Sequence, residues 1–136
     1  MSANLAREWI AKADADLDAV ERCLAGTLPN VIVACYHCQQ AAEKLVKALL
    51  VAAEVRYPRG KEGHDIALCA AFLPVDHPLR EEAMAFDDLT DWATAFRYPA
   101  EDPATAEPVP DARDVSGRCE ALKGFRARVG AFLTMR

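Results

Sequence analysis

Polar side chains recur along one face of the segment from Asn30 to Glu54, where their chemistry suits the binding of an anion. They stand three and four residues apart: His37, Gln40, Lys44 and Lys47. Because an α-helix turns once in 3.6 residues, this spacing places all four on one side of a helix. Ammonium, amide and imidazole groups donate hydrogen bonds to anionic, planar ligands such as nucleotides. The same pattern also suits a solvent-exposed helix face.

Two further polar pairs lie outside this segment, at His64-Asp65 and at Arg97-Tyr98. We treat all four residues as candidate ligand-binding residues together with the stripe. Each pair also has a structural interpretation. Asp65 can cap the N-terminus of a short helix, and Arg97 close to a helix C-terminus complements the helix dipole.

Common catalytic and metal-binding motifs are absent from the sequence, including the phosphate-binding glycine loop, the serine nucleophile elbow and the zinc helix. Cys38 follows His37 directly, but neighbouring residues on a helix point about 100° apart, so the pair is poorly aimed. The histidines His37, His64 and His77 belong to three separate elements. We therefore expect no catalytic residue, no metal site and no cofactor.

Composition predicts one ordinary globular domain over residues 1–136, with 52% hydrophobic and 27% charged residues. A net charge of −5 argues against a sequence-independent nucleic-acid binder, because such a protein neutralises phosphates with a basic surface. The most basic stretch is the loop from Val55 to Gly63, which carries Arg56, Arg59 and Lys61. A local basic patch on an acidic protein remains compatible with this charge.

The cysteines are odd in number and scattered, and most of them fall at apolar positions of helical patterns. We interpret them as buried thiols of a reducing compartment, including the C-x-x-C formed by Cys35 and Cys38. The chain begins without a signal-peptide pattern and contains no run of 18 apolar residues. We expect a cytoplasmic protein that does not associate with a membrane.

Hydrophobic periodicity predicts an all-α fold, an up-and-down bundle of about five helices resembling a four-helix bundle. The expected helices span residues 2–25, 30–54, 64–72, 79–96 and 111–136, with Ser2 capping the first and Pro29 in the first turn of the second. An acidic, proline-rich loop precedes the last helix. In the long second helix, Ala34, Ala41 and Ala48 stand seven residues apart, and we expect this line of small residues to meet a symmetry mate.

The order of these motifs resembles the HEPN domain, a family found in higher eukaryotes and prokaryotes. The similarity rests on Trp9 and Asp16-Leu17, then on ACYHCQQAAEKLVKALL from Ala34 to Leu50, then on His64-Asp65 and Arg97-Tyr98-Pro99. It implies a helical, usually homodimeric bundle whose members include nucleotide-binding modules, partners of minimal nucleotidyltransferases and metal-independent ribonucleases. Residues that match the family pattern are Gln40, Glu43, Lys44, His64, Asp65, Arg97 and Tyr98.

Ribonuclease members of this family carry an arginine followed four to six residues later by a histidine. These two groups orient the phosphate and move protons at the 2′-hydroxyl. Here no histidine follows Arg97. Without this histidine the ribonuclease pair is incomplete. The sequence also lacks the arginine–histidine–tyrosine setting in which partner nucleotidyltransferases modify a tyrosine of some members.

We therefore expect a non-catalytic HEPN-type homodimer that binds a nucleotide, a minimal nucleotidyltransferase of a toxin–antitoxin-like system, or both. In this hypothesis Lys44, Lys47 and Arg97 face phosphate. Gln40 and Tyr98 contact the sugar or base. The alternative is a metal-independent endoribonuclease in which His64 or His37 works with Arg97, and only this alternative makes RNA a partner. A purely structural dimerisation domain is the third option.

Overall fold

The computed structural model describes residues 2–135, which form helices and loops and contain no strand. The predicted all-α bundle is confirmed. The α-helices are α1 (Ser2–Leu24), α2 (Val31–Ala52), α3 (Ile66–Ala70), α4 (Arg80–Met84) and α5 (Ala112–Thr134). Three 3₁₀ helices complete the described chain: η1 (Gly60–His64), η2 (Asp87–Ala93) and η3 (Pro103–Thr105).

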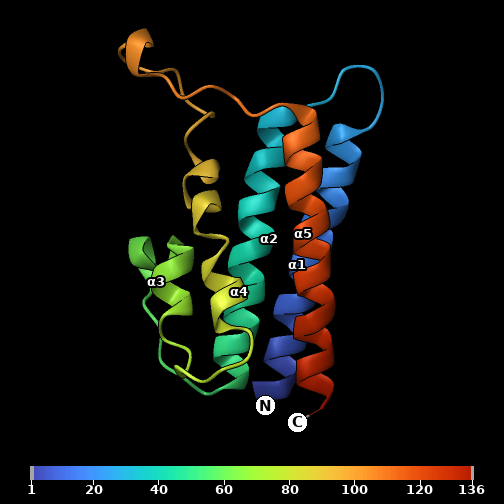
Figure 1. The fold of residues 1–136 in the computed structure, drawn as a ribbon, viewed down its shortest axis with the longest axis vertical. Helices are drawn as coiled ribbons and strands as arrows, with labels where there is room; N and C mark the ends of the chain where they lie inside the picture. The colour runs from blue at the N-terminus through green and yellow to red at the C-terminus, as the bar shows by residue number, and fades with distance from the viewer. Residues whose placement is uncertain (1, 136) are drawn as a thin grey trace.

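Helix α2 is the centre of the bundle and contacts α1, α5, α3 and η2. Figure 1 shows α1 rising from the N-terminus, α2 descending, α4 and η2 rising again and α5 descending to the C-terminus. Asn30 caps α2, because its side-chain oxygen accepts a hydrogen bond from the backbone N–H of Val33 at 3.3 Å. The helix therefore begins after Pro29, and the prediction that Pro29 lies in its first turn was wrong. Ser2 lies within α1 and does not cap it.

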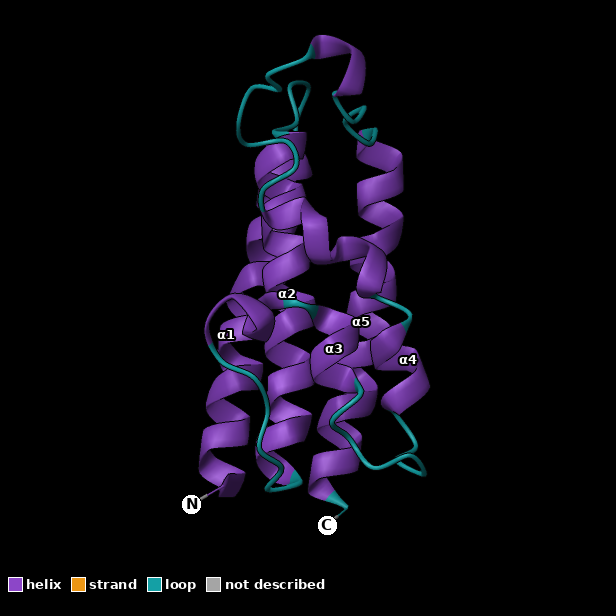
Figure 2. Cartoon of the chain, turned by 90° about the vertical axis from the view of Figure 1, so that its left-hand side faces the viewer, coloured by secondary structure: helices purple, strands orange, loops and turns teal. Residues whose placement is uncertain are grey.

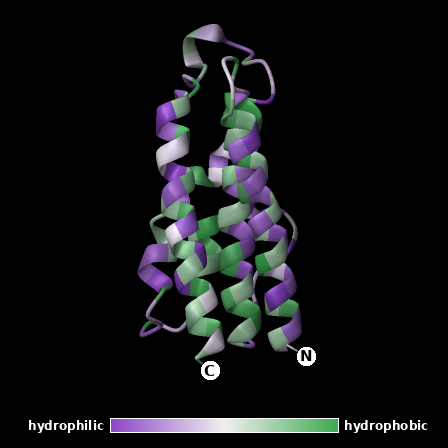
Figure 3. Cartoon of the chain, turned by 90° about the vertical axis from the view of Figure 1, so that its right-hand side faces the viewer, coloured by the Kyte–Doolittle hydropathy of each residue, from purple (hydrophilic) through white to green (hydrophobic). Residues whose placement is uncertain are grey.

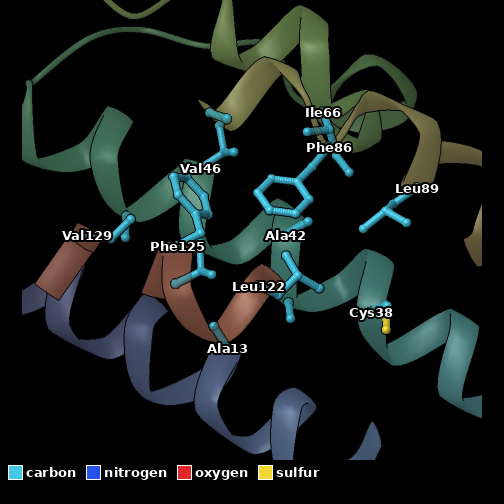
Figure 4. Close-up of a cluster of buried hydrophobic side chains, with 14 of the residues drawn as sticks. Ala13, Cys38, Ala42, Val46, Ile66, Phe86, Leu89, Leu122, Phe125 and Val129 are labelled. Atoms are coloured by element: carbon cyan, nitrogen blue, oxygen red, sulfur yellow. The ribbon is translucent and has the colours of Figure 1, made fainter. Parts of the chain in front are cut away.

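The hydrophobic core lies between α1, α2, α5 and the α3–η2 region (Figure 4). Phe125 of α5 is fully buried and packs against Phe86 with their ring centroids 5.3 Å apart. Leu45 and Leu49 continue the seam of α2 into this core. Apolar side chains of α1 and α5 turn inward, while hydrophilic stretches occupy the outer sides of these helices (Figure 3).

Four of the five free cysteines are buried, as the sequence predicted. Burial raises the pKa of the Cys35 thiol to about 11 and also raises the pKa of Cys38. Thiols with such raised pKa values are poor nucleophiles near neutral pH, because only the thiolate reacts. The C-x-x-C pair is thus part of the core.

The alanine line of α2 does not face a symmetry mate. Ala34, Ala41 and Ala48 are each 0% exposed within the single chain. Small residues at these positions let the helices of the same protomer approach closely, and α1 contributes Ala6 and Ala13 to the buried set. The prediction was wrong because periodicity identifies a packing face without identifying the helix that covers it.

The helix predicted over residues 79–96 is broken into α4 and η2. The break has a physical reason in the N-terminus of α3, whose first N–H groups need acceptors. Thr90 Oγ1 accepts from the N–H of Ile66 at 3.1 Å, and Asp87 Oδ1 accepts from that of Ala67 at 3.2 Å. Asp and Thr also have low helix propensities. The segment that contains Asp87 and Thr90 is therefore not a regular α-helix, and its side chains cap α3.

Two loops frame the bundle. Residues 55–63, predicted as a loop, contain the 3₁₀ turn η1, and residues 98–111 form an exposed arm interrupted by η3 (Figure 2). Asp111 caps α5 by accepting from the N–H of Asp114 at 2.8 Å. None of the helices in residues 2–135 is both long and apolar enough to cross a membrane.

Candidate functional site

The polar stripe of α2 lies beside two buried carboxylates. His37, Gln40, Lys44 and Lys47 are all partly exposed. Asp16 of α1 and Glu43 of α2, by contrast, are each only 6% exposed. Burying an ionised carboxylate is costly unless charged or hydrogen-bonding partners surround it. The stripe supplies most of those partners in two clusters, and Gln39 and His64 supply the others.

The Asp16 cluster joins α1 to α2. The Nδ1–H of His37 donates to Asp16 Oδ1 at 2.8 Å, and the ammonium of Lys44 donates to Asp16 Oδ2 at 2.6 Å. Asp16 belongs to the inward face of α1, beside the buried residues Ala13 and Leu17. The Asp16 carboxylate therefore lies at the contact between the two helices and holds His37 and Lys44 of α2 in place.

The Glu43 cluster joins α2 to η1. Glu43 accepts hydrogen bonds from Lys47 Nζ at 3.0 Å, from His64 Nδ1 at 2.8 Å and from Gln39 Nε2 at 3.1 Å. Gln40 in turn donates to Gln39 Oε1 at 2.7 Å. Burial by itself would raise the pKa of Glu43, but the hydrogen bonds from His64, Lys47 and Gln39 and the charge of Lys47 outweigh it, so its pKa lies below the ordinary value.

Gly63 brings His64 to this cluster. A Cβ at Gly63 would lie 2.9 Å from the carbonyl oxygen of Pro58 and 3.9 Å from Lys47 Nζ. Glycine at this position therefore allows the close turn from Pro58 to Gly63 within the loop. The next residue, His64 at the end of η1, reaches Glu43.

Aromatic rings border both clusters. Lys47 Nζ lies 5.5 Å from the centroid of the Trp9 ring, a cation–π contact. Tyr36 meets His37 edge to face at 5.1 Å, and the Arg97 guanidinium lies 4.8 Å from the Tyr36 ring. Arg97 thereby adds a cation near the Asp16 cluster.

The structure thus gathers most of the predicted residues. His37, Gln40, Lys44, Lys47 and His64 belong to the two clusters. Arg97 lies at the edge of the clusters. The centroid of the Tyr98 ring is 6.0 Å from the Arg97 guanidinium, and 67% of the surface of Tyr98 is exposed. Asp65 is not brought into the clusters. Its carboxylate accepts a hydrogen bond from the N–H of Leu68 at 2.9 Å and caps α3, as the structural interpretation of Asp65 predicted.

Sequence reasoning assigned no site role to Asp16 or Glu43. The available signal was a charged residue at an inward-facing helical position, which is rare unless the charge is paired. The sequence prediction considered only Arg97 as the arginine, although Arg59 precedes His64 by five residues. Arg59 is exposed at the start of η1, 5.5 Å from the Tyr57 ring.

Other parts of the described chain offer less chemistry. A groove of about 950 Å³ runs between α1 and α5 and is lined by small residues and by Arg7 and Arg126, but it includes none of the predicted ligand-binding residues. Within residues 2–135, no three His, Cys, Asp or Glu side chains are grouped so that they could hold a metal ion.

The HEPN domain family model matches residues 6–123 of the chain. The match covers α1, α2, both clusters and the first half of α5. Neither the curated proteins nor the solved structures contain a match.

Replacing Glu43 tests the role of the buried carboxylate. A lowered pKa means that ionised Glu43 stabilises the fold above the unfolded pKa, near 4.5, and that this contribution is lost as the pH falls through the lower folded value. We expect Glu43→Gln to lower the free energy of unfolding at pH 7 by about 1–3 kcal/mol and to flatten its acid dependence. Urea titrations between pH 3 and pH 7 measure both effects, with the exposed Glu8→Gln as the matched control. An unchanged acid dependence in Glu43→Gln would contradict this role.

Proposed function

The chain belongs to the HEPN domain family, and on that premise we propose that the two clusters bind phosphate groups of a nucleotide or of RNA. One observation carries this proposal: two buried carboxylates each hold a lysine and a histidine on the same partly exposed face. An ordinary surface lysine needs no buried counterion. Lysine and histidine side chains that are already held in place, by comparison, bind an anion without the entropy cost of ordering them.

The paired cations still have hydrogen bonds to give. An ammonium has three N–H donors, and Lys44 and Lys47 each use one of them on a carboxylate. Each imidazole keeps its Nε2 for a second partner. The clusters therefore offer several donors along one helix face, which matches the oxygens of a phosphate.

Charge and aromatic groups around the clusters support the same ligand. Arg56, Arg59 and Lys61 lie on the exposed loop that leads into His64, and none of them makes an ion pair within the described chain. Trp9 and Tyr36 provide ring faces beside the lysines and the arginine. Base stacking on such rings is tolerant of sequence. A local group of basic side chains thus allows a chain with a net charge of −5 to bind an anionic ligand.

Removing both cluster lysines tests phosphate binding. Lys44→Gln/Lys47→Gln removes two charges but keeps amide donors for Asp16 and Glu43. We expect it to weaken binding of a labelled single-stranded RNA by tenfold or more and to reduce the salt dependence of log K by about 1.4 for two lost phosphate contacts. Fluorescence anisotropy measures the RNA, and calorimetry with ATP, GTP and AMP distinguishes a free nucleotide.

Lys123→Gln, at a lysine of α5 that pairs with Glu21 and Glu120 outside both clusters, is the matched control and should bind like the wild type. Equal affinities of the control and the double variant would place the ligand elsewhere. Absence of saturable binding to any of these ligands would remove the proposal.

A metal-independent endoribonuclease is the second candidate function, and the five-residue interval from Arg59 to His64 favours it. Glu43 holds the Nδ1 of His64 and leaves 61% of the imidazole side chain exposed. A carboxylate that fixes one ring nitrogen orients the other for proton transfer. In this candidate Arg59, and not Arg97, is the arginine of the family pair.

Cleavage of single-stranded RNA in the presence of EDTA tests this candidate. We expect His64→Asn to slow cleavage by about 10²–10⁴-fold, as loss of a general acid or base does, and Arg59→Ala by about 10²-fold through loss of charge stabilisation. Arg113→Ala, an exposed arginine on α5, should cleave like the wild type. Full activity of His64→Asn would remove His64 from the mechanism.

The homodimer and the minimal nucleotidyltransferase partner stay predictions. The exposed arm of residues 98–111 carries the acidic residues Glu101, Asp102 and Glu107 and makes no extensive contact with the bundle. Within the described chain, we expect such a partner chain to bind at this arm.

A further inference from the structure

A groove of about 950 Å³ lies between α1 and α5, at the end of the bundle where α1 begins and α5 ends (Figure 1). Its floor is apolar and buried, because Ala6, Ile10 and Ala52 are each at most 7% exposed. Ala11 and Ala131 line it as exposed residues. Sites for small molecules commonly have volumes of about 300–1,000 Å³. The groove thus has the size of a ligand site, and it shares no residue with the two clusters.

The charged side chains of the groove leave one cation without an ionic partner. Arg126 of α5 donates to Asp14 of α1 from Nε at 2.8 Å and from Nη2 at 3.0 Å, so these two charges are paired. Arg7 is the other charged residue of the lining. Its guanidinium donates to the side chain of Asn4 and makes no ion pair within residues 2–135. A guanidinium in this state is suited to a carboxylate or a similar anionic group.

Arg126 keeps a further donor at the same groove. Its Nη1 takes no part in the contact with Asp14. A Cβ at Gly130 would lie only 2.7 Å from this nitrogen, so the glycine leaves the space that the guanidinium occupies. The groove therefore carries one unpaired positive charge and one additional N–H donor above an apolar floor.

The lining suits an aliphatic chain better than a nucleotide. No aromatic ring lines the groove, so a base would have no ring on which to stack. One unpaired guanidinium matches a single negative charge and not a triphosphate. The lining residues of α1 extend from Ser2 to Asp14, on the order of 18 Å along the helix axis. An extended hydrocarbon chain that ends in one acidic group fits this length and this charge.

The ion pairs between α1 and α5 disfavour a helix from a second copy or from another protein. Asp14 and Arg126 mark one end of the groove lining and join the two helices there. Lys123 and Glu21 form a second ion pair between the same helices, beyond that end. A partner helix about 10–12 Å in diameter that lay along the groove would meet the first of these pairs. A hydrocarbon chain is much narrower.

We propose that this groove binds an aliphatic monoanion, a fatty-acid carboxylate in chemical class. Its acidic group pairs with Arg7, and its hydrocarbon chain covers Ala6, Ile10 and Ala52. Removal of the chain from water supplies the affinity, and Arg7 selects the charge. This ligand and its site are separate from the phosphate ligand of the proposed function.

Calorimetry with decanoate tests the proposal, and decyltrimethylammonium carries the same chain with the opposite charge. We expect one saturable decanoate site per chain and binding of the cation that is weaker by about tenfold or more. Arg7→Gln should weaken decanoate binding by about tenfold, because a charge-assisted hydrogen bond is lost. The matched control is Arg22→Gln, at an exposed arginine of α1 that pairs with Asp18 outside the groove, and it should bind like the wild type.

A second pair of variants tests the location. Ala131→Phe adds a ring at an exposed residue of the groove and should abolish decanoate binding. Ala127→Phe, equally exposed on α5 but outside the lining, should not. Urea titrations show whether both variants keep the fold. If Ala131→Phe does not fold, amide shifts of the ¹⁵N-labelled wild type at Ala6 and Ala52 locate the bound decanoate.

The outcomes separate this site from the clusters. Equal affinities for decanoate and the cation, or for the wild type and Arg7→Gln, would overturn the acidic ligand. Absence of saturable decanoate binding would overturn the site, and a sedimentation change in Ala131→Phe alone would then assign the groove to a contact between copies of the chain. Decanoate should not displace single-stranded RNA from the wild type. Either proposal can therefore fail while the other stands.

Discussion

The burial of Asp16 and Glu43 constrains the arrangement of the whole site. Each carboxylate leaves water at a cost that only nearby cations and hydrogen-bond donors offset. The donors come from different parts of the chain: Asp16 lies on α1, its partners lie on α2, and Glu43 recruits His64 from η1. These interactions fix α1 and the 55–64 loop against α2 more specifically than apolar packing, which tolerates sliding.

The same constraint explains how an acidic chain can present a basic site. Net charge describes the long-range field, whereas a phosphate responds to the donors within hydrogen-bond distance. Lys44 and Lys47 are each neutralised in part by a buried carboxylate, and an ammonium has more N–H donors than the one that this contact uses. The unpaired cations of the loop before His64 add to this face. Under the proposed function, recognition of the ligand is therefore local and depends on geometry more than on total charge.

Local patterns in the sequence predicted the parts of this structure that local physics determines. The period of α2, the cap at Asp111 and the burial of four cysteines follow from neighbouring residues. Partners far apart in the sequence were not predictable in this way. Asp16 and Lys44 are 28 residues apart, and the break between α4 and η2 serves the N-terminus of α3. Periodicity predicted the face but not the partner.

The central claim is that the ligand of this protein binds across the Asp16 and Glu43 clusters. A titration of the ¹⁵N-labelled chain with a single-stranded RNA or with ATP, followed by amide and imidazole NMR signals, tests it most directly. The account predicts that the largest shifts occur at His37, His64 and the α2 amides between them, with the side-chain N–H of Trp9 moving too. Shifts concentrated in the groove between α1 and α5, with the two imidazoles unchanged, would contradict it.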